Sequence, residues 1–197
     1  MKQLFFGLAI VTATFSACNN TNNKSKESDA KKNDSTRSNT PVVKTELKNP
    51  GPVNDVISGY LKIKNALTND NGKVAATGGK EISEAINKID EASITAEQKK
   101  VFDAVKDDIQ EHGEHISLNS SKIAHQREHF DMLSDDIYSF VKTFGSSQTL
   151  YKDNCPMYSQ GQGADWLSEI KEIKNPYLGK KMITCGSVKE EIRPRSK

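Results

Sequence analysis

Two pairs of sulfur-bearing residues lie near the C-terminal end of the chain. Cys155 and Met157 flank a proline, and Met182 is followed three residues later by Cys185. Thiolates and thioethers are soft ligands, which select Cu(I) over harder ions. Because alternate side chains of an extended segment share one face, Cys155 and Met157 are expected to point the same way. The two pairs therefore indicate a soft-metal site built from four sulfur atoms.

A disulfide is the alternative explanation for the two cysteines. Cysteines in an oxidising compartment commonly pair, and a Cys155–Cys185 bond would close a loop of about 31 residues, stabilising the fold by roughly 3.5 kcal/mol in the chain-entropy model. A disulfide does not explain the methionine beside each cysteine, although methionine also fills gaps in protein cores. From these residues alone, both interpretations stay open.

The four histidines of the chain lie within a stretch of 18 residues. His112 and His115 are three apart and His125 and His129 are four apart, spacings that place each pair on one helical face. His112 continues the apolar face of its helix, so we expect it to be buried in the core with a hydrogen-bonded neighbour. His125 and His129 form a side stripe with Met132, which the C-terminal segment could cover; a solvated face is the alternative.

Several functional classes find no support in the composition or the motifs. The chain has a formal net charge of +2, and it lacks a Lys/Arg stripe that would indicate nucleic-acid binding. It has no C-x-x-C, no H-E-x-x-H and no Gly-rich phosphate loop after a strand. A Cys155–His129 nucleophile pair would lack an orienting third group and an oxyanion site. We therefore predict that the protein is not an enzyme.

The N-terminal region has the pattern of a bacterial lipoprotein. Residues 1–17 combine a lysine, a short apolar run and small residues directly before Cys18, which predicts a signal peptide and a lipidated cysteine. A plain secretory cleavage near Ala17 is the alternative. Residues 18–51 are polar and poor in apolar side chains, which predicts a disordered tether. The signal peptide also predicts a compartment in which disulfides are permitted.

Four segments place apolar residues at helical spacing: residues 53–70, 72–90, 93–116 and 120–145. Thr95 and Gln98 form a capping-box pattern, a serine cap is expected before the fourth helix, and Gly145 is expected to end it. Short connections between the segments predict an antiparallel four-helix bundle, and hence an all-α fold.

Residues 146–192, here called the clasp, are rich in Gly, Pro, Asn and aromatic side chains. We expect an irregular segment packed on the bundle, with a turn at "NPYLG" and a short strand near the end. A short helix is expected over residues 164–173, with Trp166, Leu167, Ile170 and Ile173 facing inward. The turn should return Cys185 to Cys155 and bring their sulfur atoms within about 4 Å, whether they share a bond or a metal. Residues 52–192 would then form one domain, followed by a flexible tail at 193–197.

The segments "YLKIKNAL", "HQREHFDMLSDDIYSFVKTFG" and "CPM…WLS…NPY.G..M..CG" resemble an uncharacterised family of domains of unknown function. The resemblance covers roughly residues 52–192. This family occurs as lipid-anchored periplasmic proteins of Gram-negative bacteria and as an extension of the adaptor subunits of heavy-metal efflux pumps of the resistance–nodulation–division type. A small residue typically follows "CPM" in the family, and Tyr158 departs from that pattern. The resemblance implies a role in handling copper or silver, with the ligands Cys155, Met157, Met182, Cys185 and His129.

The sequence thus predicts a periplasmic protein anchored by a lipid, on the inner leaflet of the outer membrane, that binds Cu(I) or Ag(I). Its expected partners are the membrane and the adaptor of a heavy-metal efflux pump. His125 and Met132 are further candidate ligands, and zinc is a less favoured ion because a Cys₂His set with an open position also suits it. The alternative is a structural or adaptor module that docks to an envelope partner and carries a Cys155–Cys185 disulfide.

Overall fold

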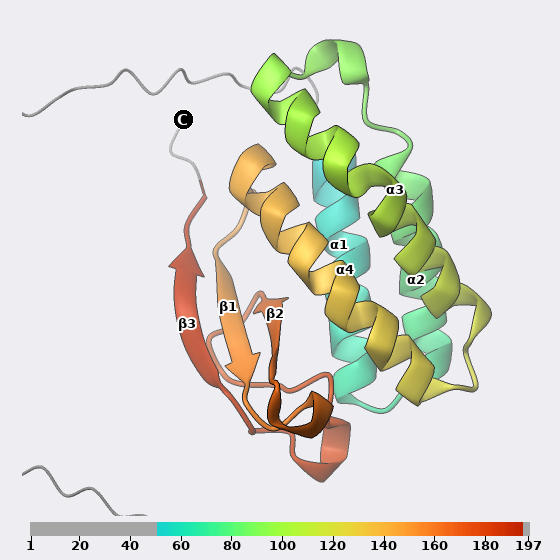
Figure 1. The fold of residues 1–197 in the computed structure, drawn as a ribbon, viewed down its shortest axis with the longest axis vertical. Helices are drawn as coiled ribbons and strands as arrows, with labels where there is room; N and C mark the ends of the chain where they lie inside the picture. The colour runs from blue at the N-terminus through green and yellow to red at the C-terminus, as the bar shows by residue number, and fades with distance from the viewer. Residues whose placement is uncertain (1–50, 195–197) are drawn as a thin grey trace, which may run out of the picture. The chain divides into compact units, whose positions relative to one another are not determined.

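The computed structural model describes residues 51–194, which form four α-helices and one three-stranded antiparallel sheet (Figure 1). The helices are α1 (Gly51–Thr68), α2 (Gly72–Ile86), α3 (Ala96–Leu118) and α4 (Ile123–Phe144). The strands are β1 (Leu150–Cys155), β2 (Ala164–Ser168) and β3 (Ser187–Ile192). The predicted signal peptide, the lipidated Cys18 and the tether up to residue 50 lie outside the described residues, as do residues 195–197 of the tail.

The expectation of an all-α fold is wrong, because the clasp forms a sheet. β1 lies in the centre and pairs antiparallel with β2 on one side and with β3 on the other. Residues 164–168, the first half of the expected helix at 164–173, are β2, and Trp166 pairs with Asp153 of β1. The central strand offers this segment a ladder of backbone partners, whereas a five-residue helix would leave most of its own backbone groups unpaired.

The helical part of the expectation is confirmed. Thr95 and Gln98 make both hydrogen bonds of a capping box at the start of α3. The serine cap expected for α4 is wrong, because Lys122 occupies the cap position and makes no side-chain cap hydrogen bond. Gly145 follows the end of α4 with a φ of 82°, a conformation that favours glycine.

Gly78 and Gly79 lower the intrinsic helix propensity of α2. They also allow α2 to approach α1 and α3 closely. A Cβ atom added to Gly79 would lie 2.5 Å from the carbonyl oxygen of Gly113 and 2.8 Å from the backbone nitrogen of Ser117, both in α3. A Cβ atom added to Gly78 would lie 2.8 Å from Cγ1 of Ile63 in α1. The absence of side chains here therefore sets the spacing of the first three helices.

We expect Gly79→Ala to destabilise the protein, although alanine is the better helix former. The propensity gain is about 1 kcal/mol, whereas overpacking against a neighbouring backbone costs about 1–3 kcal/mol. A net loss of about 1 kcal/mol in the free energy of unfolding should be measurable in guanidinium chloride. A variant more stable than the parent would show that α2 and α3 can separate without cost.

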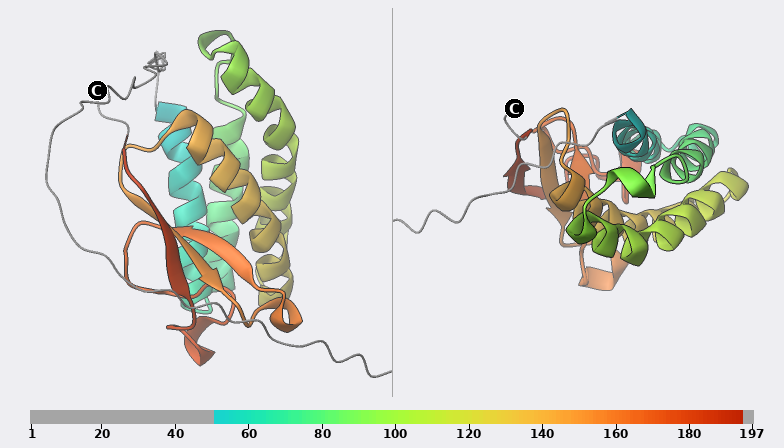
Figure 2. Two further views of the ribbon diagram at one scale, coloured as in Figure 1. Left: turned by 60° about the vertical axis from the view of Figure 1, so that its left-hand side comes forward. Right: turned by 90° about the horizontal axis from the view of Figure 1, so that it is seen from above.

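Buried hydroxyl groups connect the sheet to the bundle. The Tyr60 hydroxyl of α1 accepts a hydrogen bond from the backbone nitrogen of Leu167 in β2 at 2.9 Å and lies 2.9 Å from Oγ of Ser134 in α4. The Tyr177 hydroxyl of the clasp donates to the carbonyl of Asp165 and lies 3.4 Å from the same Ser134 oxygen. Figure 2 shows the sheet on the side of the bundle formed by α1 and α4. The clasp thus shares one core with the helices.

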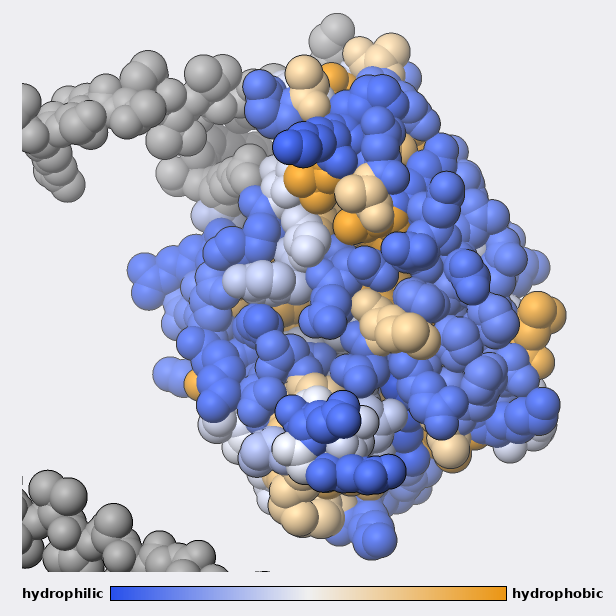
Figure 3. Space-filling view, viewed as in Figure 1, coloured by the Kyte–Doolittle hydropathy of each residue, from blue (hydrophilic) through white to orange (hydrophobic). Residues whose placement is uncertain are grey.

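The face drawn in Figure 3 is mostly hydrophilic, with isolated hydrophobic side chains over the helices. Within residues 51–194, none of the helices combines the length and the apolar character needed to cross a membrane.

Candidate metal centre

The two cysteines of the clasp lie side by side as free thiols. Cys155 ends β1, and its sulfur lies 3.5 Å from the sulfur of Cys185. Two thiolates bound at about 2.3 Å to one tetrahedral ion would lie about 3.8 Å apart, whereas bonded sulfurs lie about 2.05 Å apart. Small movements of the two side chains would therefore allow the sulfurs either to bind one ion together or to form a disulfide. The expected proximity of the thiols is confirmed, while their role as ligands stays a prediction.

Exposure of the two thiols differs. Cys155 is buried, with 0% of its surface exposed, whereas Cys185 is partly exposed. An ion would therefore reach the pair from the side of Cys185. The neighbouring Cys155 thiol, which hydrogen-bonds to Cys185, raises the pKa of Cys185 above its usual range. Two adjacent thiolates repel each other, so loss of both protons is favoured only when a cation neutralises them.

Asn175 holds the loop that carries Cys185, and the sequence reasoning missed it. Its side-chain amide donates to the carbonyl of Cys185 at 2.7 Å, and its backbone nitrogen donates to the carbonyl of Ile183 at 2.8 Å. Its side-chain oxygen accepts from the backbone nitrogens of Tyr177 and Leu178, each at 2.8 Å. The available signal was the Asn-Pro dipeptide of "NPYLG", since asparagine side chains commonly organise the turn that follows them.

We expect Asn175→Ala to reduce the free energy of unfolding by about 2 kcal/mol, because buried backbone groups lose their hydrogen-bond partners. The exposed Asn69, whose side chain bonds only to the carbonyl of Asn65, provides a matched control as Asn69→Ala. Denaturant unfolding of both variants measures the difference. Equal stability of the two variants would show that Asn175 does not hold the clasp together.

Gly186 follows Cys185 in a conformation that other residues rarely adopt. Its φ is 143°, and an added Cβ atom would lie 2.9 Å from both the carbonyl oxygen of Asn154 and a ring carbon of Trp166. The close approach fixes where the chain leaves Cys185 and enters β3. It also places the single tryptophan of the protein beside the thiol loop, where its fluorescence can report on the site.

The two predicted methionine ligands differ in position. Met157 has 56% of its surface exposed and follows Cys155 after one proline. Met182 is partly exposed, and its carbonyl accepts a hydrogen bond from the backbone nitrogen of Cys185 at 3.0 Å. Tyr158, the departure from the family pattern, stacks on Tyr177 with ring centroids 4.5 Å apart. The bulk of Tyr158 is thereby used in packing the clasp.

Met132, named as a further ligand candidate, lies on α4 with 46% of its surface exposed. It borders a shallow hollow between α4 and the sheet, together with the carboxyl groups of Asp131, Asp135 and Asp165. Carboxylates are hard oxygen ligands, unlike the soft sulfurs of the thiol pair. Met132 therefore borders hard oxygen donors.

His129 lies among histidines and not beside the thiols. Ligand atoms of His115, His125 and His129 lie within 4.8 Å of one another, and within residues 51–194 no thiol belongs to such a group of three. The burial expected for His112 is wrong: its side chain is partly exposed, and its Nδ1 lies 3.2 Å from Nδ1 of His129. Antiparallel helices joined by a short loop bring the end of one beside the start of the next, a signal that could have predicted this meeting.

Residues 56–149 match the model of a family described as a protein of unknown function, DUF3347. The match confirms the expected resemblance to an uncharacterised family, and it runs from within α1 through α2, α3 and α4 to the residue before β1. The run with both cysteines lies beyond the matched residues. No match was found among curated proteins or among solved structures.

Proposed function

We propose that the protein binds Cu(I) or Ag(I) through the thiolates of Cys155 and Cys185. The observation that carries this proposal is the 3.5 Å separation of two free thiols, one buried and one partly exposed. Soft thiolates favour monovalent copper and silver, and the arrangement needs little rearrangement to enclose an ion. Binding would release the thiol protons, so the apparent affinity should rise with pH.

Met157 and Met182 are the proposed thioether ligands. Both follow or precede a cysteine closely in the chain, and both side chains have access to solvent. Neutral thioethers add soft donors without adding a charge that must be desolvated. A site that combines two thiolates with exposed thioethers can pass its ion to another protein, because the outer ligands can be exchanged first. His129 is not included in this ligand set.

The proposed setting is the cell envelope. We propose that Cys18 carries a lipid on the inner leaflet of the outer membrane, and that residues 18–50 connect it to the folded domain. The N-terminal sequence pattern and the family resemblance support this setting. In the periplasm the domain would buffer the ion or deliver it to the adaptor of a heavy-metal efflux pump. The long polar connection would let the site reach such a partner.

A thiol count and a copper titration test the proposal together. The protein purified without reductant should show two reactive thiols, which disappear when one equivalent of Cu(I) is added under anaerobic conditions. The fluorescence of Trp166 should change in the same titration and reach its end point at the same equivalent. A protein with no free thiols that fails to bind Cu(I) even after mild reduction would refute the proposal.

The same separation of the thiols supports the structural alternative, in which Cys155 and Cys185 are oxidised to a disulfide. The bond would link the end of β1 to the loop before β3 and stabilise the clasp against the bundle. The domain would then serve as an adaptor or docking module. Oxidised protein with unchanged stability after reduction would contradict this alternative, since closing a loop of about 31 residues is worth several kcal/mol.

We expect Met157→Leu to weaken Cu(I) binding by about tenfold, which corresponds to about 1.4 kcal/mol, while leaving the stability nearly unchanged. Leucine keeps the volume of methionine, and the side chain is exposed. Met132→Leu is the comparison, because Met132 is similarly exposed but lies on α4, outside the clasp. Competition with a Cu(I) chelator measures both affinities. Equal affinities would remove Met157 from the ligand set.

A further inference from the structure

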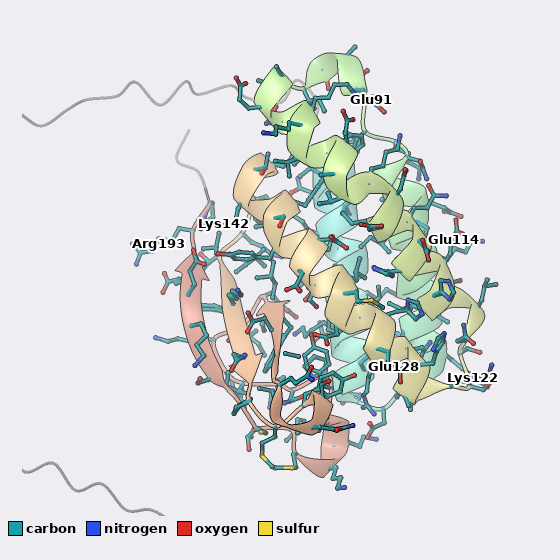
Figure 4. The ribbon with its side chains drawn as sticks, viewed as in Figure 1. Glu91, Glu114, Lys122, Glu128, Lys142 and Arg193 are labelled. Atoms are coloured by element: carbon teal, nitrogen blue, oxygen red, sulfur yellow. The ribbon has the colours of Figure 1, made fainter. Side chains whose placement is uncertain are left out.

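All four histidines of the chain meet where the end of α3 passes the start of α4. The labelled Glu114 of α3 and Glu128 of α4 mark this region in Figure 4. The ring of His129 lies between those of its neighbours, with centroids 4.1 Å from His115, 4.5 Å from His125 and 5.3 Å from His112. No part of the proposed thiol site belongs to this group.

Three of these side chains offer nitrogen atoms at distances that suit one metal ion. Ligand atoms of His115, His125 and His129 lie within 4.8 Å of one another. The side chains of His115 and His125 are 44% and 38% exposed, so an ion could reach them from solvent. The rings of His115 and His129 are nearly parallel, at 8°, so one ring must rotate for both lone pairs to converge. The terminal torsion of histidine has broad minima, which makes this rotation inexpensive.

Two of the rings have a neighbour within hydrogen-bond distance of Nδ1, which leaves Nε2 free to bind an ion. Nδ1 of His125 lies 3.3 Å from a carboxylate oxygen of Glu128, which leaves its Nε2 available. Nδ1 of His129 lies 3.2 Å from Nδ1 of His112, which likewise leaves its Nε2 available. Histidine ligands of metals commonly make such a second contact, which fixes the tautomer and the ring orientation.

Burial and the neighbouring rings disfavour the charged forms of His129 and His112. Burial lowers the pKa of His129 to about 4, and electrostatic repulsion from the nearby His115, His125 and His112 acts in the same direction. Burial likewise lowers the pKa of His112. The acidic groups around the cluster are Asp108, Glu111 and Glu128, which partly oppose these shifts.

We propose that His115, His125 and His129 bind one divalent ion of borderline softness, with Zn²⁺ as the representative, at a site separate from the two thiols. His112 and Glu128 are positioning residues that orient His129 and His125. Imidazole suits zinc and Cu(II) better than it suits the hard ion Mg²⁺. Three histidines leave a fourth position for water or another ligand, as in zinc sites with an open coordination position.

The test uses the full chain with its three cysteines removed as Cys18→Ser, Cys155→Ala and Cys185→Ser, so that it is independent of the proposed Cu(I) site. Calorimetric titration should show one equivalent of Zn²⁺ bound and no binding of Mg²⁺. His125→Gln and, separately, His115→Gln should weaken Zn²⁺ binding by more than about 100-fold. Replacing a residue that only hydrogen-bonds to a ligand already lowers metal affinity by about 10- to 100-fold. Both side chains are partly exposed, so these variants are expected to fold.

Two further variants separate ligands from positioning residues and from general charge effects. His112→Gln should weaken Zn²⁺ binding by about tenfold without changing the stoichiometry. Glu114→Gln is the charge control, because its exposed side chain bonds to Gln110 and lies outside the histidine group. Its affinity should stay close to that of the parent. No Zn²⁺ binding by the thiol-free protein, or unchanged binding by His125→Gln and His115→Gln, would overturn the proposal.

Discussion

Replacing Cys185 with serine is expected to lower the affinity for Cu(I) by at least about a thousandfold, or about 4 kcal/mol. The variant keeps the size of the side chain but replaces a soft thiolate by a hydroxyl, which remains protonated and binds Cu(I) poorly. Cys185 is the better choice than Cys155, because Cys155 is fully buried and a hydroxyl there would need a new hydrogen-bond partner. Competition with a Cu(I) chelator gives the affinity.

Thr184→Ala is the control for this variant. Thr184 is exposed and directly precedes Cys185, so its replacement tests whether any change in the loop disturbs the site. It should bind Cu(I) as the parent does. Comparable loss of affinity in both variants would point to the loop conformation, and unchanged affinity in Cys185→Ser would remove the thiol pair from the site.

The second large effect concerns Asp153, whose side chain is buried where the sheet meets the bundle. Its exposed fraction is 0%, and neither carboxylate oxygen has a hydrogen-bond partner. Burial raises the pKa of Asp153 to about 7, and the positive charge of the buried Lys64 opposes the shift. Lys64 itself forms an ion pair with Glu169 at 2.8 Å. The charged form of Asp153 is thus poorly compensated.

The raised pKa makes stability depend on pH in a defined direction. Between the unfolded value near 4 and the folded value near 7, the folded chain binds the proton that the unfolded chain has lost. The contribution to stability is therefore full below about pH 4 and decreases as the pH rises toward 7. A shift of about three units corresponds to at most about 4 kcal/mol.

Asp153→Asn removes the charge and should remove this pH dependence. At pH 8 we expect the variant to be more stable than the parent by about 2 kcal/mol, since the lost attraction to Lys64 offsets part of the gain. At pH 4.5 the two proteins should be nearly equal. Guanidinium chloride unfolding at both pH values measures the difference. The exposed Asp55, changed to Asn, is the control, and a variant less stable than the parent at pH 8 would contradict the account.

The helices could be predicted because their signals are local. The capping box of Thr95 and Gln98 and the apolar spacing of each segment lie within a few turns of the chain. The sheet could not be predicted in this way, because β1 pairs with β3 across a long stretch of sequence, with Leu150 opposite Ile192. Non-local pairing leaves little signal within a single segment.

The wrong prediction of a short helix over residues 164–173 has a physical cause. Trp166, Leu167, Ile170 and Ile173 have the spacing of an apolar helical face, yet Ile170 is 39% exposed. Trp166 and Leu167 are both buried because β2 is covered on both faces, which removes the alternation typical of a half-buried strand. A strand of this kind cannot be distinguished from a buried helical segment by its periodicity.

Part of the candidate site could be predicted from the sequence. The approach of Cys155 to Cys185 followed from the turn that "NPYLG" imposes, and Asn175 is the residue that makes this turn. The assignment of His129 to the same site relied on the family resemblance. The contacts of His129 with three other histidines depend on how α3 and α4 pack, which the individual helical patterns do not specify.

X-ray absorption at the copper K edge, on protein loaded with one equivalent of Cu(I), tests the central claim most directly. The account predicts that the bound ion is monovalent, that at least two sulfur atoms surround it in the parent, and that one fewer does so in Cys185→Ser. Copper surrounded only by nitrogen or oxygen atoms in the parent would contradict the account, because the ion would then lie away from Cys155 and Cys185.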